Sequence, residues 1–266
     1  MNGVVLAHTV RGRLRGMAGW TFGLIAAALM VLAIYPTIRD NSGFIDLVES
    51  YPEALLAMLG IDATDYLSGA GYLSAQLYAV YVPLFMLMLG IGFGARAIAG
   101  EEDQGTLVML LGNPITRTRV LMEKAAALTC VVAVPLLGVA ATILTVGPAF
   151  GVSVNVRGVL AVTLLAYLLA VAHGFIAMAA GSAGLRRGAA VAVAALVAAA
   201  GYLVNGLASL VHNLAWLRRL SPFYYYQEHD PLRGGAVASD AAVLAALALA
   251  ALAVALPLFR RRDLRA

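Results

Sequence analysis

The residues whose types and spacing say most about function lie in one polar segment, residues 100–124. Its first half combines acids, a glycine and leucines: Glu101, Glu102, Asp103, Gly105, Thr106, Leu110 and Leu111. Acids at the start of a helix interact favourably with its dipole, and the leucines recur at helical spacing. The pattern predicts a short amphipathic helix that docks on another protein. A helix that contacts only lipid is the alternative, but an acidic start suits the negative inner leaflet poorly.

The second half of this segment predicts a break and then a further helix. Gly112 stands where a glycine commonly ends a helix. Asn113 is a good N-cap, and Pro114 suits the first position of the helix that follows. The basic residues Arg117 and Lys124 lie within that helix and are expected near the inner headgroups.

Residue patterns of the common catalytic and metal sites are missing from the sequence. There is no G-x-x-x-x-G-K-[ST] motif, so ATP binding through a P-loop in this chain is excluded. None of the four histidines has the spacing of a metal site. Ser182, in Gly181–Gly184, approximates the nucleophile turn of an intramembrane serine protease only poorly. Cys130, the one cysteine, is expected to be a small buried apolar residue.

The elements that position the polar segment are apolar helices. Hydrophobic residues make up 62% of the 266 residues and charged residues only 12%, whereas soluble domains carry about 25% charged residues. A helix of about 20 apolar residues crosses a bilayer. Six uncharged runs are long enough: Gly16–Ile38, Tyr66–Ala95, Ala125–Val156, Gly158–Leu185, Gly188–Leu217 and Ala241–Phe259. The expected fold is an all-α polytopic membrane protein with six transmembrane helices in a single domain, residues 1–266.

Lys and Arg concentrate in alternate connections, which predicts that both termini and residues 96–124 are cytoplasmic. Residues 1–15 form an apolar stripe with arginines beside it, typical of a helix on the inner surface, or of the frayed start of the first span. A signal peptide is disfavoured, because the first run is long and lacks a clear cleavage site. Residues 212–240, rich in aromatic side chains, are expected at the outer interface.

A few polar residues lie inside the predicted spans. His173, Asn205 and Gln76 either face a translocation pathway or form packing hydrogen bonds between helices. The spans contain no carboxylate, which disfavours an ion-coupled carrier. Gly90 and Gly94 have G-x-x-x-G spacing, which allows helices to approach closely and makes a dimer contact there a hypothesis.

The segment Glu101–Lys124 resembles the connection between the second and third spans of ABC type-2 permeases, the membrane subunits of ATP-binding-cassette exporters. That family combines a glutamate-rich opening, Gly-Thr, a leucine-rich turn, Pro-x-x-Arg and a downstream Lys. A second similarity is Leu220–Tyr225, a Ser-Pro-aromatic stretch before the last span. The order of the spans agrees as well, so the resemblance extends over nearly the whole chain.

The resemblance implies a subunit of an exporter in the cell (inner) membrane, paired with a second permease copy and docked on a separate ATPase that binds ATP and Mg. Residues 101–111 would form the coupling helix. Its expected coupling residues are Glu101, Glu102, Asp103, Gly105, Thr106, Leu110, Pro114 and Arg117. The substrate would be hydrophobic or amphipathic, such as a drug, antibiotic or lipid. The chain itself would be no enzyme, and would bind neither metal nor nucleic acid. An ion channel, a secondary transporter or, less favoured, an intramembrane enzyme remain the alternatives.

Overall fold

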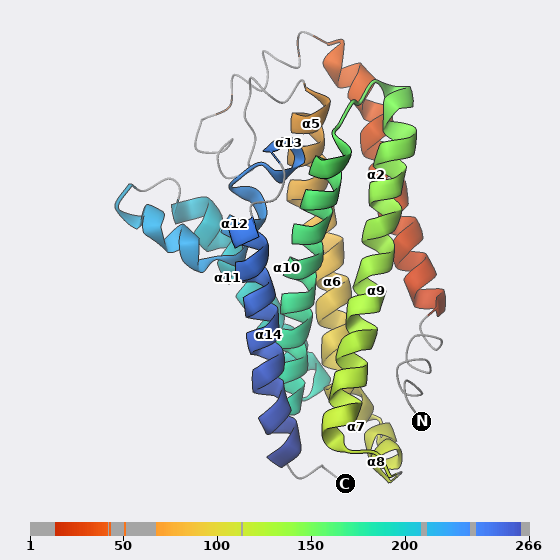
Figure 1. The fold of residues 1–266 in the computed structure, drawn as a ribbon, viewed down its shortest axis with the longest axis vertical. Coiled ribbons are helices and arrows are strands. Elements are labelled where there is room, and N and C mark those ends of the chain that lie inside the picture. Colours follow the sequence, from red (N-terminus) through yellow and green to blue (C-terminus); the bar gives the residue numbers. More distant parts are fainter. Residues whose placement is uncertain are drawn as a thin grey trace.

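The computed structural model describes residues 14–41, 43, 51, 68–112, 114–208, 212–234 and 238–261. Within these residues six helices are long and apolar enough to cross a membrane (Figure 1). Five of the six spans are built on a single long α-helix: α2 (Leu14–Arg39), α9 (Arg117–Val146), α10 (Val156–Ser182), α11 (Arg187–Ala208) and α14 (Ala238–Arg261). The all-α, six-helix architecture predicted from the sequence is confirmed.

The second span, Gly69–Asp103, is one continuous helix of 35 residues with two wider, π-helical stretches. Its parts are α5 (Gly69–Tyr72), η1 (Leu73–Tyr81), α6 (Val82–Ala95), η2 (Arg96–Gly100) and α7 (Glu101–Asp103). Pro83 is the second residue after η1. A proline has no N–H and its ring crowds the carbonyl of the preceding turn, and the π-helical winding gives that turn more room.

Short elements connect the spans at both ends of the bundle. At the lower end in Figure 1, α8 (Thr106–Leu111) follows α7. The 3-10 helix η3 (Gly147–Phe150) extends α9. Between α11 and α14 lie η4 (His212–Leu220), α12 (Pro222–Gln227) and α13 (Pro231–Gly234), on the upper half of the molecule.

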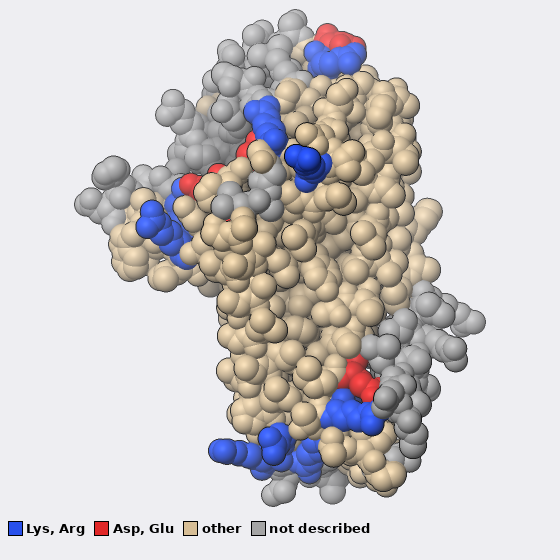
Figure 2. Space-filling view, viewed as in Figure 1, with Lys and Arg blue, Asp and Glu red and all other residues tan. Residues whose placement is uncertain are grey.

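Charged side chains gather toward the two ends of the bundle. Figure 2 shows a broad uncharged band between an upper and a lower group of Lys, Arg, Asp and Glu side chains. Large apolar side chains such as Phe22, Leu137 and Leu196 are exposed on the helices that form the band. An apolar girdle between two charged rims is the surface that a bilayer requires.

Helix α10 lies at the centre of the bundle and is the most buried of the spans. It packs most extensively on α6 and α14, and also on α9 and α11. Small residues allow the close contact with α6. A Cβ atom on Gly90 would lie 2.6 Å from the carbonyl oxygen of Ala170, and one on Gly94 would overlap the carbonyl oxygen of Gly174. The dimer contact considered for Gly90 and Gly94 is therefore wrong, because α10 of the same chain occupies that face.

The helices differ from the predicted runs mainly at their ends. The second span continues eight residues beyond Ala95, and the third begins at Arg117 rather than at Ala125. The fifth ends at Ala208, short of Leu217, and η4 packs beside it. Hydropathy alone ends a span at the first charge, whereas helical hydrogen bonding continues where charged side chains find partners or reach water. The predicted inner helix of residues 1–15 lies almost entirely outside the described residues.

Substituting Gly94 by Ala should destabilise the protein by about 2 kcal/mol or more, because the added methyl group has no room beside the backbone of α10. The matched control is Gly92→Ala, two residues away, where a Cβ meets nothing within 4 Å. Thermal unfolding in detergent measures both. Equal melting temperatures for the two variants would show that α6 and α10 do not approach this closely.

Candidate coupling site

The helix that ends the second span and the short helix after it are joined by a sharp turn at Gly105. This glycine has a φ of 70°, in the left-handed region that residues with a Cβ adopt reluctantly. Its N–H donates to the carbonyl of Glu102 at 2.9 Å. The Thr106 hydroxyl donates to the carbonyl of Glu101 at 3.1 Å. The acids therefore end a long helix, instead of opening a short one as predicted, and the chain reverses immediately after them.

A buried ion pair joins this turn to the third span. The Lys124 ammonium contacts the Glu101 carboxylate, and only 1% of the lysine side chain is exposed. Lys124 was expected at the headgroups, but it lies inside the bundle. Its charge is tolerated there because Glu101 neutralises it.

Asp103 joins the same turn to the fifth span. Its Oδ2 accepts a hydrogen bond of 3.0 Å from the backbone N–H of Arg187, the first residue of α11. The first N–H groups of a helix have no partner within that helix, and an Asp oxygen is among the best acceptors for them. Asp103 thus caps a helix that begins 84 residues further along the chain.

The start of α9 makes a third contact, to the last span. Arg117 Nη1 donates to the carbonyl oxygen of Phe259 in α14 at 3.4 Å. The N-cap of α9 is Thr116, whose hydroxyl accepts from the N–H of Arg119 at 3.3 Å. The helix therefore begins three residues later than expected. Pro114 lies in an exposed bend before it, and Asn113 lies outside the described residues.

The two faces of α8 are clearly distinct. Leu107 is fully buried, and Leu110 is partly buried against the main core. Val108 and Met109 point outward, with 46% and 78% of their surfaces exposed. Leu110, predicted to contact the partner, packs on the core instead, and the outward residues Val108 and Met109 were not among the predicted site residues. The position of Met109 opposite Leu107 and Leu111 on the helix could have indicated it.

The polar residues inside the spans are separated from this site. His173 is completely buried in α10, and its Nδ1 donates to the carbonyl of Leu169 at 2.8 Å, within the same helix. His173 Nε2 and Asn205 Oδ1 have no hydrogen-bond partner in the described part of the chain. Gln76 is partly buried in η1. Cys130, expected to be buried, is exposed on α9.

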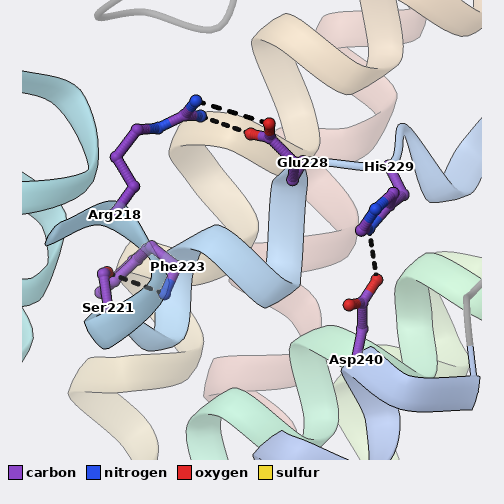
Figure 3. A network of polar contacts seen from close by, with 6 residues as sticks. All are labelled: Arg218, Ser221, Phe223, Glu228, His229 and Asp240. Atoms are coloured by element: carbon purple, nitrogen blue, oxygen red, sulfur yellow. Dashed lines mark hydrogen bonds and ion pairs between the residues drawn. The ribbon is translucent and has the colours of Figure 1, made fainter. Parts of the chain in front are cut away.

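A second polar network lies at the opposite end of the bundle, around α12 (Figure 3). Ser221 caps α12 by accepting from the N–H of Phe223 at 3.1 Å, and its hydroxyl donates to the carbonyl of Gly201 at 2.7 Å. The Arg218 guanidinium pairs with Glu228. His229 Nδ1 lies 2.7 Å from Oδ2 of the buried Asp240. These contacts hold α12 to η4, α11 and α14.

Six helices long and apolar enough to cross a membrane, with a short helical turn held at one end by contacts to α9 and α11, define a polytopic membrane protein. A family model described as ABC-2 family transporter protein matches residues 4–264. The chain therefore belongs to the ABC-2 transporter family and is a membrane permease component, as the resemblance of residues 101–124 predicted. No curated protein matches the sequence. Among the described residues no group of His, Cys, Asp and Glu could hold a metal ion.

Replacing Glu101 by Ala should lower stability by about 3 kcal/mol, because it removes the carboxylate that contacts the buried Lys124 ammonium. The double variant E101A/K124M should recover most of that loss, since it removes the buried charge as well. Thermal unfolding of the two variants and the wild type tests this. A double variant no more stable than E101A would contradict the ion pair.

Asp103→Ala should cost about 1 kcal/mol through loss of the cap on α11, whereas Asp103→Asn should retain most of the stability. The decisive measurement is hydrogen exchange in the first turn of α11. Exchange there should accelerate in the Ala variant only; acceleration confined to α7 and α8 would disprove the cap.

Proposed function

We propose that this chain is the membrane-spanning subunit of an ATP-driven exporter, and that α7 and α8 form the helix that docks on a separate ATPase subunit. The observation that carries the proposal is the exposed apolar pair Val108 and Met109, on a turn held by three spans. Exposed methionines suit a protein interface. Glu101, Asp103 and Arg117 act as the internal connections of this turn.

The connections suggest how movement would reach the spans. A displacement of α8 acts directly on α7 at Gly105, on α9 through Glu101 and Lys124, and on α11 through Asp103. ATP and Mg would bind the partner ATPase. Closure of an ATPase pair would then drive rocking of the helices about a central path. Two copies of the chain would form that path, with α8 and both termini on the cytoplasmic side of the cell membrane.

A hydrophobic or amphipathic substrate, such as a drug, antibiotic or lipid, fits the character of the spans. Between the second span and α11 lies a cavity of about 300 Å³ with an apolar lining. Its wall includes Pro83, Leu87, Ala198 and Tyr202, and Phe223 of α12 also lines it. Apolar cavities of this size bind apolar ligands. An ion channel or ion-coupled carrier is disfavoured by the family, and the six apolar runs of the sequence contain no carboxylate that an ion-coupled carrier would use.

Met109→Asp should weaken ATPase docking at least about tenfold, because it places a charge at the centre of an apolar contact. Stability should change little, since the side chain is 78% exposed. Co-purification of a P-loop ATPase with the tagged chain from its native host, together with vanadate-sensitive ATPase activity, measures the effect.

Thr118→Asp is the matched control, because it adds the same charge at an exposed position at the start of α9, where acids are favourable. It should co-purify as the wild type does. Loss in Met109→Asp alone would also assign this end of the bundle to the cytoplasm, where the ATPase is. If no ATPase accompanies even the wild type, the exporter proposal fails.

A further inference from the structure

A cavity of about 220 Å³ lies between α2, α6 and α9, on the same side of the molecule as the coupling site. Most of its wall is apolar, and Trp20, Phe93 and Val131 belong to it. Met88 lines it and is 57% exposed on the outside of the bundle, so the cavity opens toward the hydrocarbon region. Val108 and Met109, the residues proposed to contact the ATPase, do not line this cavity.

Two arginines, Arg96 and Arg187, line the same cavity. Their aliphatic stems converge on the bare backbone of Gly100, where a Cβ would lie 2.8 Å from Arg96 Cγ and 3.3 Å from Arg187 Cδ. A side chain at this position would therefore push the two arginines apart. The glycine lets two positive side chains of different spans come together at the edge of an apolar cavity.

No described residue supplies a counter-charge to either guanidinium group. Neither forms an ion pair or a side-chain hydrogen bond within the ranges that the structure describes. Asp103 meets Arg187 through the backbone, since its Oδ2 accepts from the Arg187 N–H. Two adjacent positive charges repel each other, and an anion placed between them would convert that repulsion into attraction.

The ligand that satisfies both features is anionic at one end and apolar at the other. Arginine binds phosphate through paired, charge-assisted hydrogen bonds, and basic pockets between transmembrane helices accept lipid headgroups. We propose that this cavity binds an anionic phospholipid of the surrounding bilayer, with its phosphate at Arg96 and Arg187 and one acyl chain beside Gly92 and Trp20. The proposal is independent of which substrate the protein exports.

The test uses the purified full-length protein, delipidated in detergent, and native mass spectrometry of added phosphatidylglycerol or phosphatidylcholine. Phosphatidylglycerol should bind the wild type at least about tenfold more tightly than phosphatidylcholine, and R96Q/R187Q should lose that preference. Arg219→Gln, an exposed arginine at the opposite end, is the matched control and should bind as the wild type does. Equal binding of the two lipids, or an unchanged preference in R96Q/R187Q, overturns the proposal.

A second variant tests the apolar half without altering charge or fold. Gly92 lines the cavity, and a Cβ there meets nothing within 4 Å, so Gly92→Leu adds apolar bulk to the space from a position with room for its Cβ. It should weaken phosphatidylglycerol binding and leave the melting temperature of the lipid-free protein unchanged. Inorganic phosphate at millimolar concentration should not displace the lipid. Displacement by phosphate, or undiminished lipid binding in Gly92→Leu, would indicate a surface anion site in place of a lipid site.

Discussion

The ion pair between Glu101 and Lys124 is the interaction on which the arrangement of the coupling turn depends. It joins the end of the second span to the first part of the third. The connection between these two spans is therefore held by an ion pair as well as by the backbone. Where water is scarce, every polar group needs a partner within the protein. The buried ammonium therefore fixes the position of Glu101, and this in turn places Asp103 and Gly105, which lie on the same continuous stretch of chain.

Three acidic residues lie at the carboxyl end of the second span, and contacts with other helices compensate their charge. The carboxyl end of a helix carries partial negative charge, so three acids at the end of the second span are intrinsically unfavourable there. The bundle offsets the cost with positive charge from other elements. Glu101 contacts an ammonium, and Asp103 accepts from the amino end of α11, where the helix dipole is positive. The acids thus connect helices that are distant in sequence.

The sequence predicted the number and order of the spans because the uncharged runs are long and well separated. It misplaced their ends, since Arg96 lies within a span and Arg117 begins one, whereas hydropathy ends the apolar run at a charged residue. It predicted short helices in residues 100–124 between two spans, but not the contacts that these residues make. The partner of Asp103 lies 84 residues away, and the face that Gly90 and Gly94 present depends on how α6 and α10 pack. Such pairings are set by tertiary contacts, which no local pattern of residues encodes.

The unbroken helix Gly69–Asp103 has a mechanical consequence. At the usual rise per residue its 35 residues extend roughly 50 Å, more than the thickness of the hydrocarbon core. A continuous helix is stiff. A rotation of its charged end is therefore transmitted to the far end unless a segment between them changes its winding. The two π-helical stretches, η1 and η2, are wound differently from the α-helical rest of this span. Residues of η1 line the apolar cavity that Phe223 also lines. A rotation of the charged end would therefore change the winding of η1 and, with it, the shape of this apolar cavity.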